Sequence, residues 1–338
     1  MQPLSATPPE HAGRRRSVAE RWLARHGPAV IALLLLIAMV VLYVTLYAVS
    51  VSALPGSFEL TSTIDNAMPL VLAAVGQTIV VVTGGIDLSV GGTMDLTNSL
   101  AAAHMGGDPA SMLLWSLAVL GVGALGGLLN GLLVTLGRLQ PILVTLATLS
   151  IFQGIAIRVL PQPGGRVPHG LTNLVANPEE PTALAFLALV VLVWLGLRRT
   201  RLGVGLFAIG NDPRAARALG VRVAAVRVMA YVLSGLFAGA AGLFLAAAAT
   251  SGDATSGDVF TLTSIAATVL GGVSFFGGRG SALGSVAGAL ALSVLVNVLF
   301  FAHINPLFQS FYQGLFLVVA VIAGGLVASL LRRRRLAR

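Results

Sequence analysis

The chain has 338 residues, of which 56% are hydrophobic and only 10% are charged. An ordinary soluble domain carries roughly 25% charged residues, so a water-soluble fold could not bury this much apolar side chain. Cysteine is absent, which excludes disulfides, thiolate nucleophiles and cysteine-bound metals. All 21 basic residues are arginine, and without lysine the phosphate-binding loop G-x-x-x-x-G-K-[ST] is excluded. Any ATP hydrolysis would therefore come from a partner chain.

Long uncharged runs such as 30–49 and 184–197 predict membrane-spanning helices, because crossing a bilayer takes roughly 20 apolar residues. These runs lack the alternation of barrel strands, so the fold class is all-α, a polytopic membrane protein. We expect about ten transmembrane helices, at about 29–50, 64–83, 88–104, 111–136, 141–160, 182–197, 226–249, 259–274, 282–302 and 309–331.

The distribution of arginine predicts the orientation. With a cytoplasmic N-terminus, the positive-inside rule is obeyed by every arginine except Arg158 and Arg166, which favours an even number of spans and a cytoplasmic C-terminus. The expected domains are a cytoplasmic tail at 1–28, a transmembrane domain at 29–331 with a cytoplasmic loop at 198–227, and a cytoplasmic basic tail at 332–338. The alternative of a cleaved signal sequence ending near Ser52 is disfavoured, because the first apolar run is longer than a typical signal core. The role of the proline-rich outer loop at 161–181 stays open.

A glycine-rich stretch at 83–92 separates two apolar segments and carries Asp87. Paired glycines should interrupt the helix, and interrupted helices in a membrane bundle often line transport pathways. An acidic side chain at membrane depth usually faces a cavity or a partner, which favours a pathway role for Asp87. The alternative is that this stretch forms a tight cytoplasmic hairpin in which the aspartate caps a helix. The candidate translocation-pathway residues, which include polar side chains inside other spans, are Gly85, Asp87, Ser89, Gly91, Asp95, Asn130 and Gln153. For Asn130 and Gln153 the alternative is a hydrogen bond between helices.

A second glycine-rich stretch at 271–280 lies six spans later and is predicted on the same side of the membrane. Glycines continue at four-residue spacing from Gly280 to Gly288, and again from Gly123 to Gly131. Small residues at this spacing let helix backbones approach closely, so we interpret them as packing positions.

The cytoplasmic segment 210–220 predicts a short helix with Asn211 or Asp212 as N-cap, proline in its first turn and Gly220 as its stop. Helical geometry puts Ala215, Ala216 and Leu219 on one apolar face. Arg214 and Arg217 lie on another, which suits docking to another protein. The alternative is a surface helix on lipid headgroups.

Motifs of catalysis are absent from the sequence: it contains neither H-E-x-x-H nor G-x-S-x-G, and its five histidines lack metal-ligand spacing. We therefore expect no catalytic residue, no metal, no cofactor and no nucleic-acid partner. The excess of positive charge is explained by membrane topology, which places most arginines on one side of the bilayer.

Taken together, the stretches 84–92, Thr145 to Thr148 with Gln153-Gly154, 210–220 and 265–280 resemble the ribose-type permeases of ABC importers over about residues 64–328. The resemblance implies a type II importer-like fold in a bacterial inner membrane. It also implies a cytoplasmic ATP-binding subunit, a second permease copy or paralogue, an extracytoplasmic solute-binding protein and a sugar-like solute. In the family, the segment matching 210–220 contacts the ATPase. The resemblance therefore implies that the candidate coupling residues are Asp212, Ala215, Ala216, Leu219 and Gly220.

Three other functions stay open. A branched-chain amino acid permease of the same superfamily would differ at the first glycine motif. An ion-coupled secondary transporter would use Asp87 and Asp95 as coupling sites, but it would not need a docking helix. An intramembrane enzyme is disfavoured by the missing catalytic motifs. The sequence does not choose the solute, the residues that touch it, or between identical and different permease partners.

Overall fold

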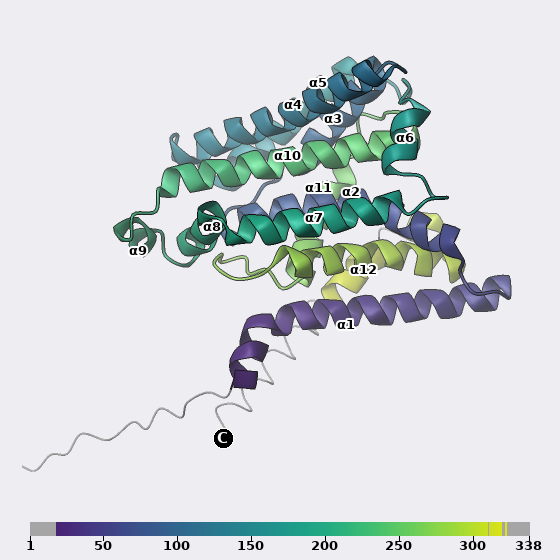
Figure 1. Ribbon diagram of the computed structural model, residues 1–338, viewed down its shortest axis with the longest axis horizontal. Helices are drawn as coiled ribbons and strands as arrows, with labels where there is room; N and C mark the ends of the chain where they lie inside the picture. Colours follow the sequence, from purple (N-terminus) through teal and green to yellow (C-terminus); the bar gives the residue numbers. More distant parts are fainter. Residues whose placement is uncertain (1–17, 310, 320–321, 323–338) are drawn as a thin grey trace, which may run out of the picture.

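The computed structural model describes residues 18–309, 311–319 and 322, and this part of the chain is almost entirely helical (Figure 1). The predicted basic tail at 332–338 and most of the N-terminal tail lie outside the described residues. The helices are α1 (Val18–Val51), α2 (Ser57–Val82), α3 (Val90–His104), α4 (Pro109–Thr135), α5 (Pro141–Val159), α6 (His169–Val175), α7 (Thr182–Arg199), α8 (Arg201–Asn211), α9 (Pro213–Ala218), α10 (Val223–Ala249), α11 (Asp258–Leu270) and α12 (Ala282–Phe301), with a 3-10 turn at Pro306–Phe308.

Seven of these helices are long and apolar enough to cross a membrane: α1, α2, α4, α5, α7, α10 and α12. The prediction of a polytopic, all-helical membrane protein is confirmed, but the count of about ten is not. Helices α3 and α11 have 15 and 13 residues, so they are only about 20 Å long against a hydrocarbon core of about 30 Å. The last predicted span, 309–331, lies partly outside the described residues.

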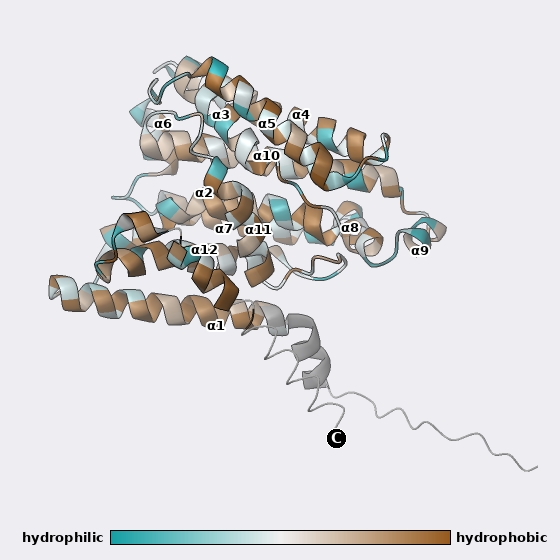
Figure 2. Cartoon of the chain, turned by 180° about the vertical axis from the view of Figure 1, so that it is seen from behind, coloured by the Kyte–Doolittle hydropathy of each residue, from teal (hydrophilic) through white to brown (hydrophobic). Residues whose placement is uncertain are grey.

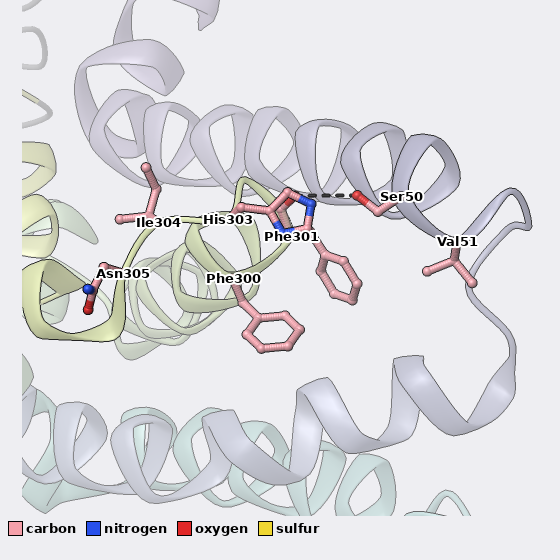
Figure 3. Close-up of a pocket in the computed structure, with 7 residues that line it drawn as sticks. All are labelled: Ser50, Val51, Phe300, Phe301, His303, Ile304 and Asn305. Atoms are coloured by element: carbon pink, nitrogen blue, oxygen red, sulfur yellow. Dashed lines mark hydrogen bonds between the residues drawn. The ribbon is translucent and has the colours of Figure 1, made fainter.

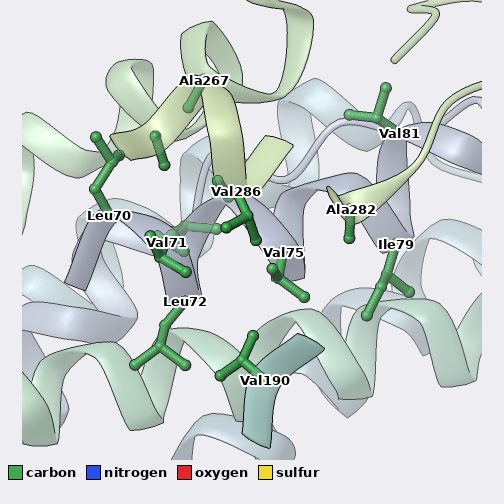
Figure 4. Close-up of a cluster of buried hydrophobic side chains, with 14 of the residues drawn as sticks. Leu70, Val71, Leu72, Val75, Ile79, Val81, Val190, Ala267, Ala282 and Val286 are labelled. Carbon is green, nitrogen blue, oxygen red and sulfur yellow. The ribbon is translucent and has the colours of Figure 1, made fainter. Parts of the chain in front are cut away.

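Helix α2 lies at the centre of the bundle. Its side chains Leu72 and Val75 lie toward Val190 of α7 and Val286 of α12, respectively, in one hydrophobic cluster (Figure 4). Helix α1 packs along α12 at the periphery (Figure 1), and of its described side chains only Ala32, Tyr43 and Tyr47 are buried. Apolar residues cover the outer faces of the helices (Figure 2), as expected for surfaces that contact lipid.

The glycine ladders pack helices inside this chain. A β-carbon on Gly127 of α4 would overlap the carbonyl oxygen of Tyr231 in α10, and one on Gly123 would overlap that of Gly235. Gly284 and Gly288 place α12 equally close to α11. The packing interpretation of both ladders is therefore confirmed within a single chain.

The two ends of the bundle differ in chemistry. Helices α8 and α9 and the loop 271–281 lie at one end, and α6 lies at the other (Figure 1). The first end carries arginines from five parts of the chain: Arg138, Arg198, Arg199, Arg201, Arg214, Arg217, Arg222, Arg227 and Arg279. At the opposite end, Arg166 donates its backbone N–H to the carbonyl of Ala102. The arginine pattern used to predict orientation therefore corresponds to one end of the structure.

Candidate functional site

The first glycine motif ends α2 and turns the chain into α3. Gly84 adopts a φ of +83°, which glycine tolerates without strain. The N–H groups of Gly84 and Gly85 donate to the carbonyls of Val81 (2.9 Å) and Val80 (3.2 Å). This is the hydrogen-bond pattern of a Schellman C-cap, so the predicted interruption of the helix is confirmed.

The second glycine motif ends α11 in the same way. Gly272 has a φ of +81° and donates its N–H to Val269 O at 2.8 Å, while Val273 N–H donates to Thr268 O at 3.2 Å. The loop then closes through a hydrogen bond from Ser274 N–H to Arg279 O (3.1 Å) before α12 begins. Both interruptions therefore follow the C-terminus of a buried apolar helix and share one geometry.

Asp87 lies just after the first interruption and is fully enclosed, with 1% of its surface exposed. One carboxylate oxygen accepts hydrogen bonds from the backbone N–H (3.0 Å) and hydroxyl (2.6 Å) of Ser89. The other accepts from the hydroxyl of Ser234 in α10 at 2.8 Å. Burial of a carboxylate is unfavourable unless such donors surround it, so the hydroxyls compensate for lost water.

The network continues into α4 and α5. The amide of Asn130 donates to the Ser89 hydroxyl at 2.8 Å, and the hydroxyl of Thr148 donates to the Asn130 carbonyl at 2.8 Å. Four separate parts of the chain are thus joined by one buried hydrogen-bonded chain. Since every member has a partner, we expect the network to fix the shape of the first interruption.

Asp95 belongs to a second polar cluster, on α3. One of its oxygens accepts the N–H of Gly257 at 2.6 Å, and the other has no partner among the described residues. Nearby, the amide of Gln153 in α5 donates to both carboxylate oxygens of Asp258, at 2.8 and 2.9 Å. Asp258 begins α11 and is exposed, so this pair presents polar atoms on the surface of the bundle.

The structure places the predicted pathway residues in two groups. Gly85, Asp87, Ser89 and Asn130 surround the first interruption, whereas Asp95 and Gln153 lie in the second cluster, and Gly91 packs against the segment leading into α11. Six of the seven are buried, and Gln153 alone is partly exposed.

A cavity of about 400 Å³ opens at the arginine-rich end, directly below the first interruption. Its lining includes Gly84, Gly85, Arg138, Arg227 and Tyr231. Tyr231 is completely buried, and its hydroxyl has no hydrogen-bond partner among the described residues. The first interruption is therefore part of the cavity lining.

A larger cavity of about 560 Å³ lies between the end of α1 and the end of α12 (Figure 3). It is lined mainly by apolar side chains, among them Val51, Phe300 and Phe301, and the Ser50 hydroxyl donates to Phe301 O. It contains none of the predicted site residues. We therefore place the functional site at the interruptions.

The segment 210–220, which the sequence predicts to be cytoplasmic, forms the predicted short helix, α9. The Asp212 carboxylate accepts the N–H groups of Arg214 (2.7 Å) and Ala215 (3.2 Å), so Asp212 is the N-cap and Asn211 is not. Pro213 opens the helix, and Gly220 ends the turn with a φ of +84°. A preceding helix, α8, was not predicted; it begins where the Thr200 hydroxyl accepts Gly203 N–H.

One detail of this helix differs from the prediction. Ala215, Ala216 and Leu219 were expected to share one face, but Ala216 is buried at 3% exposure while Leu219 is 85% exposed. The helix ends at Ala218, and Leu219 is its C-cap, whose N–H donates to Ala215 O at 3.1 Å. Leu219 is thus the prominent apolar side chain of the segment.

Four polar partners were missed from the sequence: Ser234, Thr148, Tyr231 and Asp258. Thr148 lies in a motif that we noted for its resemblance alone. Ser234 and Tyr231 lie in a long apolar helix, where nothing in the local sequence marks them. Asp258 was detectable, because it is an acid at the start of a predicted span.

This arrangement defines a class. The chain forms a polytopic bundle with two interrupted helices and buried polar side chains beside them. A capped helix projects at the arginine-rich end. Together these features are the architecture of a membrane transport permease.

Comparison with known proteins then gives the family. Residues 60–322 match the family model described as "Branched-chain amino acid transport system / permease component". The chain is 32% identical to the ribose import permease of Escherichia coli (strain K12), over 91% of this chain and 96% of the relative. It is 35% identical to an autoinducer 2 import permease of Enterobacter sp. (strain 638) over 79% of each chain, and 37% identical to a galactofuranose permease of Escherichia coli (strain K12) over 68% of each. No solved structure gives a significant match. The chain belongs to this permease family of ABC transporters, as its resemblance to the ribose-type members predicted.

Proposed function

We propose that this chain is the membrane-spanning subunit of an importer for a monosaccharide or a similar small polar solute. The names of the relatives support a sugar-like solute. One observation supports the proposal that this chain is coupled to a partner. Helix α9 projects from the bundle, is capped by Asp212 and is followed by the exposed Leu219. The energy comes from ATP hydrolysis in a separate cytoplasmic subunit, and this chain performs no catalysis.

We infer ten membrane segments, the seven long helices together with α3, α11 and the C-terminal segment at 309–331. Helices α3 and α11 cross only part of the bilayer, with the interruption beside each completing the crossing. Both termini and the arginine-rich end are cytoplasmic, in the inner membrane of a bacterium. The partners are the ATP-binding subunit, a second permease copy or paralogue, and an extracytoplasmic solute-binding protein.

The proposed pathway follows the interruptions. Gly85, Asp87, Ser89 and Asn130 shape the cytoplasmic half of the pathway, and Gly91, Asp95 and Gln153 lie toward the other half. Movement of α9 opens each half in turn as ATP is bound and hydrolysed. The partly exposed amide of Gln153 and the carboxylate of Asp258 supply polar contacts for hydroxyl groups of a passing solute.

Reconstitution tests this proposal. The permease, its ATPase and its binding protein are placed in liposomes, and uptake of labelled pentoses, hexoses and branched-chain amino acids is compared with and without ATP. We expect ATP-dependent uptake of one sugar. Uptake of a branched-chain amino acid alone would contradict the solute class, and uptake driven by an ion gradient without ATP would contradict the importer.

A further inference from the structure

Three segments that are far apart in the sequence meet at a single point at the arginine-rich end. They are the end of α2 at residues 82–85, the end of α8 at 210–211, and the second glycine loop at 277–278. Gly278 donates its backbone N–H to the carbonyl of Val82 at 2.8 Å, so a carbonyl that lacks a partner at the end of α2 is satisfied by the other interruption. The two interruptions are therefore hydrogen-bonded to each other.

The end of α8 closes this junction. The Asn211 amide donates to the carbonyl of Gly278 (3.3 Å) and to Phe207 O of its own helix (2.9 Å). A β-carbon on Gly210 would overlap the Val82 carbonyl oxygen and lie 2.5 Å from the Gly278 nitrogen. Only glycine at position 210 permits this approach, since the contact is backbone against backbone.

The junction is adjacent to the docking helix. Residue 211 ends α8, and the next residue, Asp212, is the N-cap of α9, so no flexible linker separates the two helices. A displacement of α9 is therefore applied directly to Gly210 and Asn211. From there it reaches α2 through Val82 and the loop before α12 through Gly278.

We propose that residues 82–85, 210–211 and 277–278 form a junction that transmits movement of the docking helix, α9, to both interrupted helices together. This inference rests on the proposed function. Gly210, Asn211 and Gly278 are its positioning residues, and they contact neither solute nor nucleotide. The tight backbone contacts make the junction a rigid unit, because packed interiors transmit displacement instead of absorbing it. Both halves of the pathway then respond to a single movement.

Distance measurements test the rigid unit. The chain has no cysteine, so pairs of spin labels can be placed at chosen positions in the assembled transporter. Exposed sites are Val204 on α8, Phe276 in the second loop and Val49 at the far end of α1. When the ATPase is trapped with ATP and vanadate, we expect the Val204–Val49 distance to change and the Val204–Phe276 distance to stay constant. A Val204–Phe276 distance that changes as much, or an unchanged Val204–Val49 distance, would overturn the proposal.

Substitutions test the consequence. Asn211→Ala removes the side-chain contacts of the junction without adding volume. Gly210→Ala adds a β-carbon that separates the two backbones. Gly196→Ala in α7 is the control, because Gly196 has open space around it. In both junction variants we expect the ATPase to copurify and hydrolyse ATP while solute uptake falls by roughly tenfold. Normal uptake in Asn211→Ala would overturn the junction. Failure of the proposed function looks different, because the unaltered chain itself would then bind no ATPase.

Discussion

The hydroxyl of Ser234 donates a 2.8 Å hydrogen bond to the carboxylate of Asp87, joining residues that are 147 positions apart. The bond holds the centre of α10 against the start of α3, directly beside the first interruption. Together with the two bonds from Ser89, it gives both carboxylate oxygens a donor in an environment without water. The position of the interruption therefore depends on a buried carboxylate.

Asp87→Ala should destabilise the chain and abolish uptake. The change leaves the Ser89 N–H and the Ser89 and Ser234 hydroxyls without their acceptor, and each such buried group costs about 1–3 kcal/mol. Thermal unfolding in detergent and uptake in liposomes are the measurements. Asp108→Ala is the control, because Asp108 caps α4 at an exposed position and its loss costs only about 1 kcal/mol. Equal melting temperatures for the two variants would contradict the role of the network.

Asn130 and Thr148 should be energetically coupled. Their hydrogen bond is buried between α4 and α5, and such bonds in membrane proteins contribute on average about 0.6 kcal/mol and at most about 1.7. A double-mutant cycle with Asn130→Ala and Thr148→Val, measured by reversible unfolding, should give a coupling in that range. The cycle of Asn130→Ala with Thr63→Val is the control, since Thr63 bonds to Asn297 elsewhere. Equal coupling in both cycles would argue against a local network.

Gln153→Leu should lower uptake without lowering stability. The amide is partly exposed and its partner Asp258 is exposed, so the loss removes polar atoms from the surface and leaves an unpartnered carboxylate. Uptake rate and melting temperature are measured together. Gln140→Leu, at the start of the same helix and without a side-chain capping bond, is the matched control. If Gln140→Leu and Gln153→Leu slow uptake equally, the pathway assignment of Gln153 is wrong.

Leu219→Asp should weaken binding of the ATPase while leaving the permease folded. Burial of a leucine at an interface contributes about 1.5–3 kcal/mol, so the dissociation constant should rise by roughly tenfold or more. Leu307→Asp is the control, because Leu307 is equally exposed, at 88%, but lies after α12. Ala216→Asp tests a different point: Ala216 is buried, so its replacement should destabilise α9 itself. Unchanged ATPase binding by Leu219→Asp would contradict the docking surface.

The sequence predicted those features that have a local physical signal. Paired glycines at 84–85 and 271–272 marked both interruptions, and an aspartate before proline marked the start of α9 within one residue. Apolar length marked the seven long helices. The predicted segments at 88–104 and 259–274 correspond closely to α3 and α11, and both were counted as spans because they are apolar, although each helix is too short to cross a bilayer by itself.

Contacts between distant segments could not be predicted. Ser234 is one hydroxyl in a long apolar helix, and its importance arises only because α10 packs beside Asp87. The same holds for the meeting of Val82, Gly210 and Gly278. Each of these residues was in a segment of interest, but a single sequence carries no signal that pairs them. Tertiary packing alone brings them together.

Copurification in mild detergent tests the central claim most directly. The tagged permease is isolated from cells that also contain its proposed partner proteins. ATP hydrolysis by any chain that copurifies is then measured with and without binding protein and candidate sugars. The account predicts that an ATPase copurifies and that binding protein loaded with one sugar raises its rate of hydrolysis. A permease that purifies without an ATPase, yet transports its solute into liposomes without ATP, would contradict it.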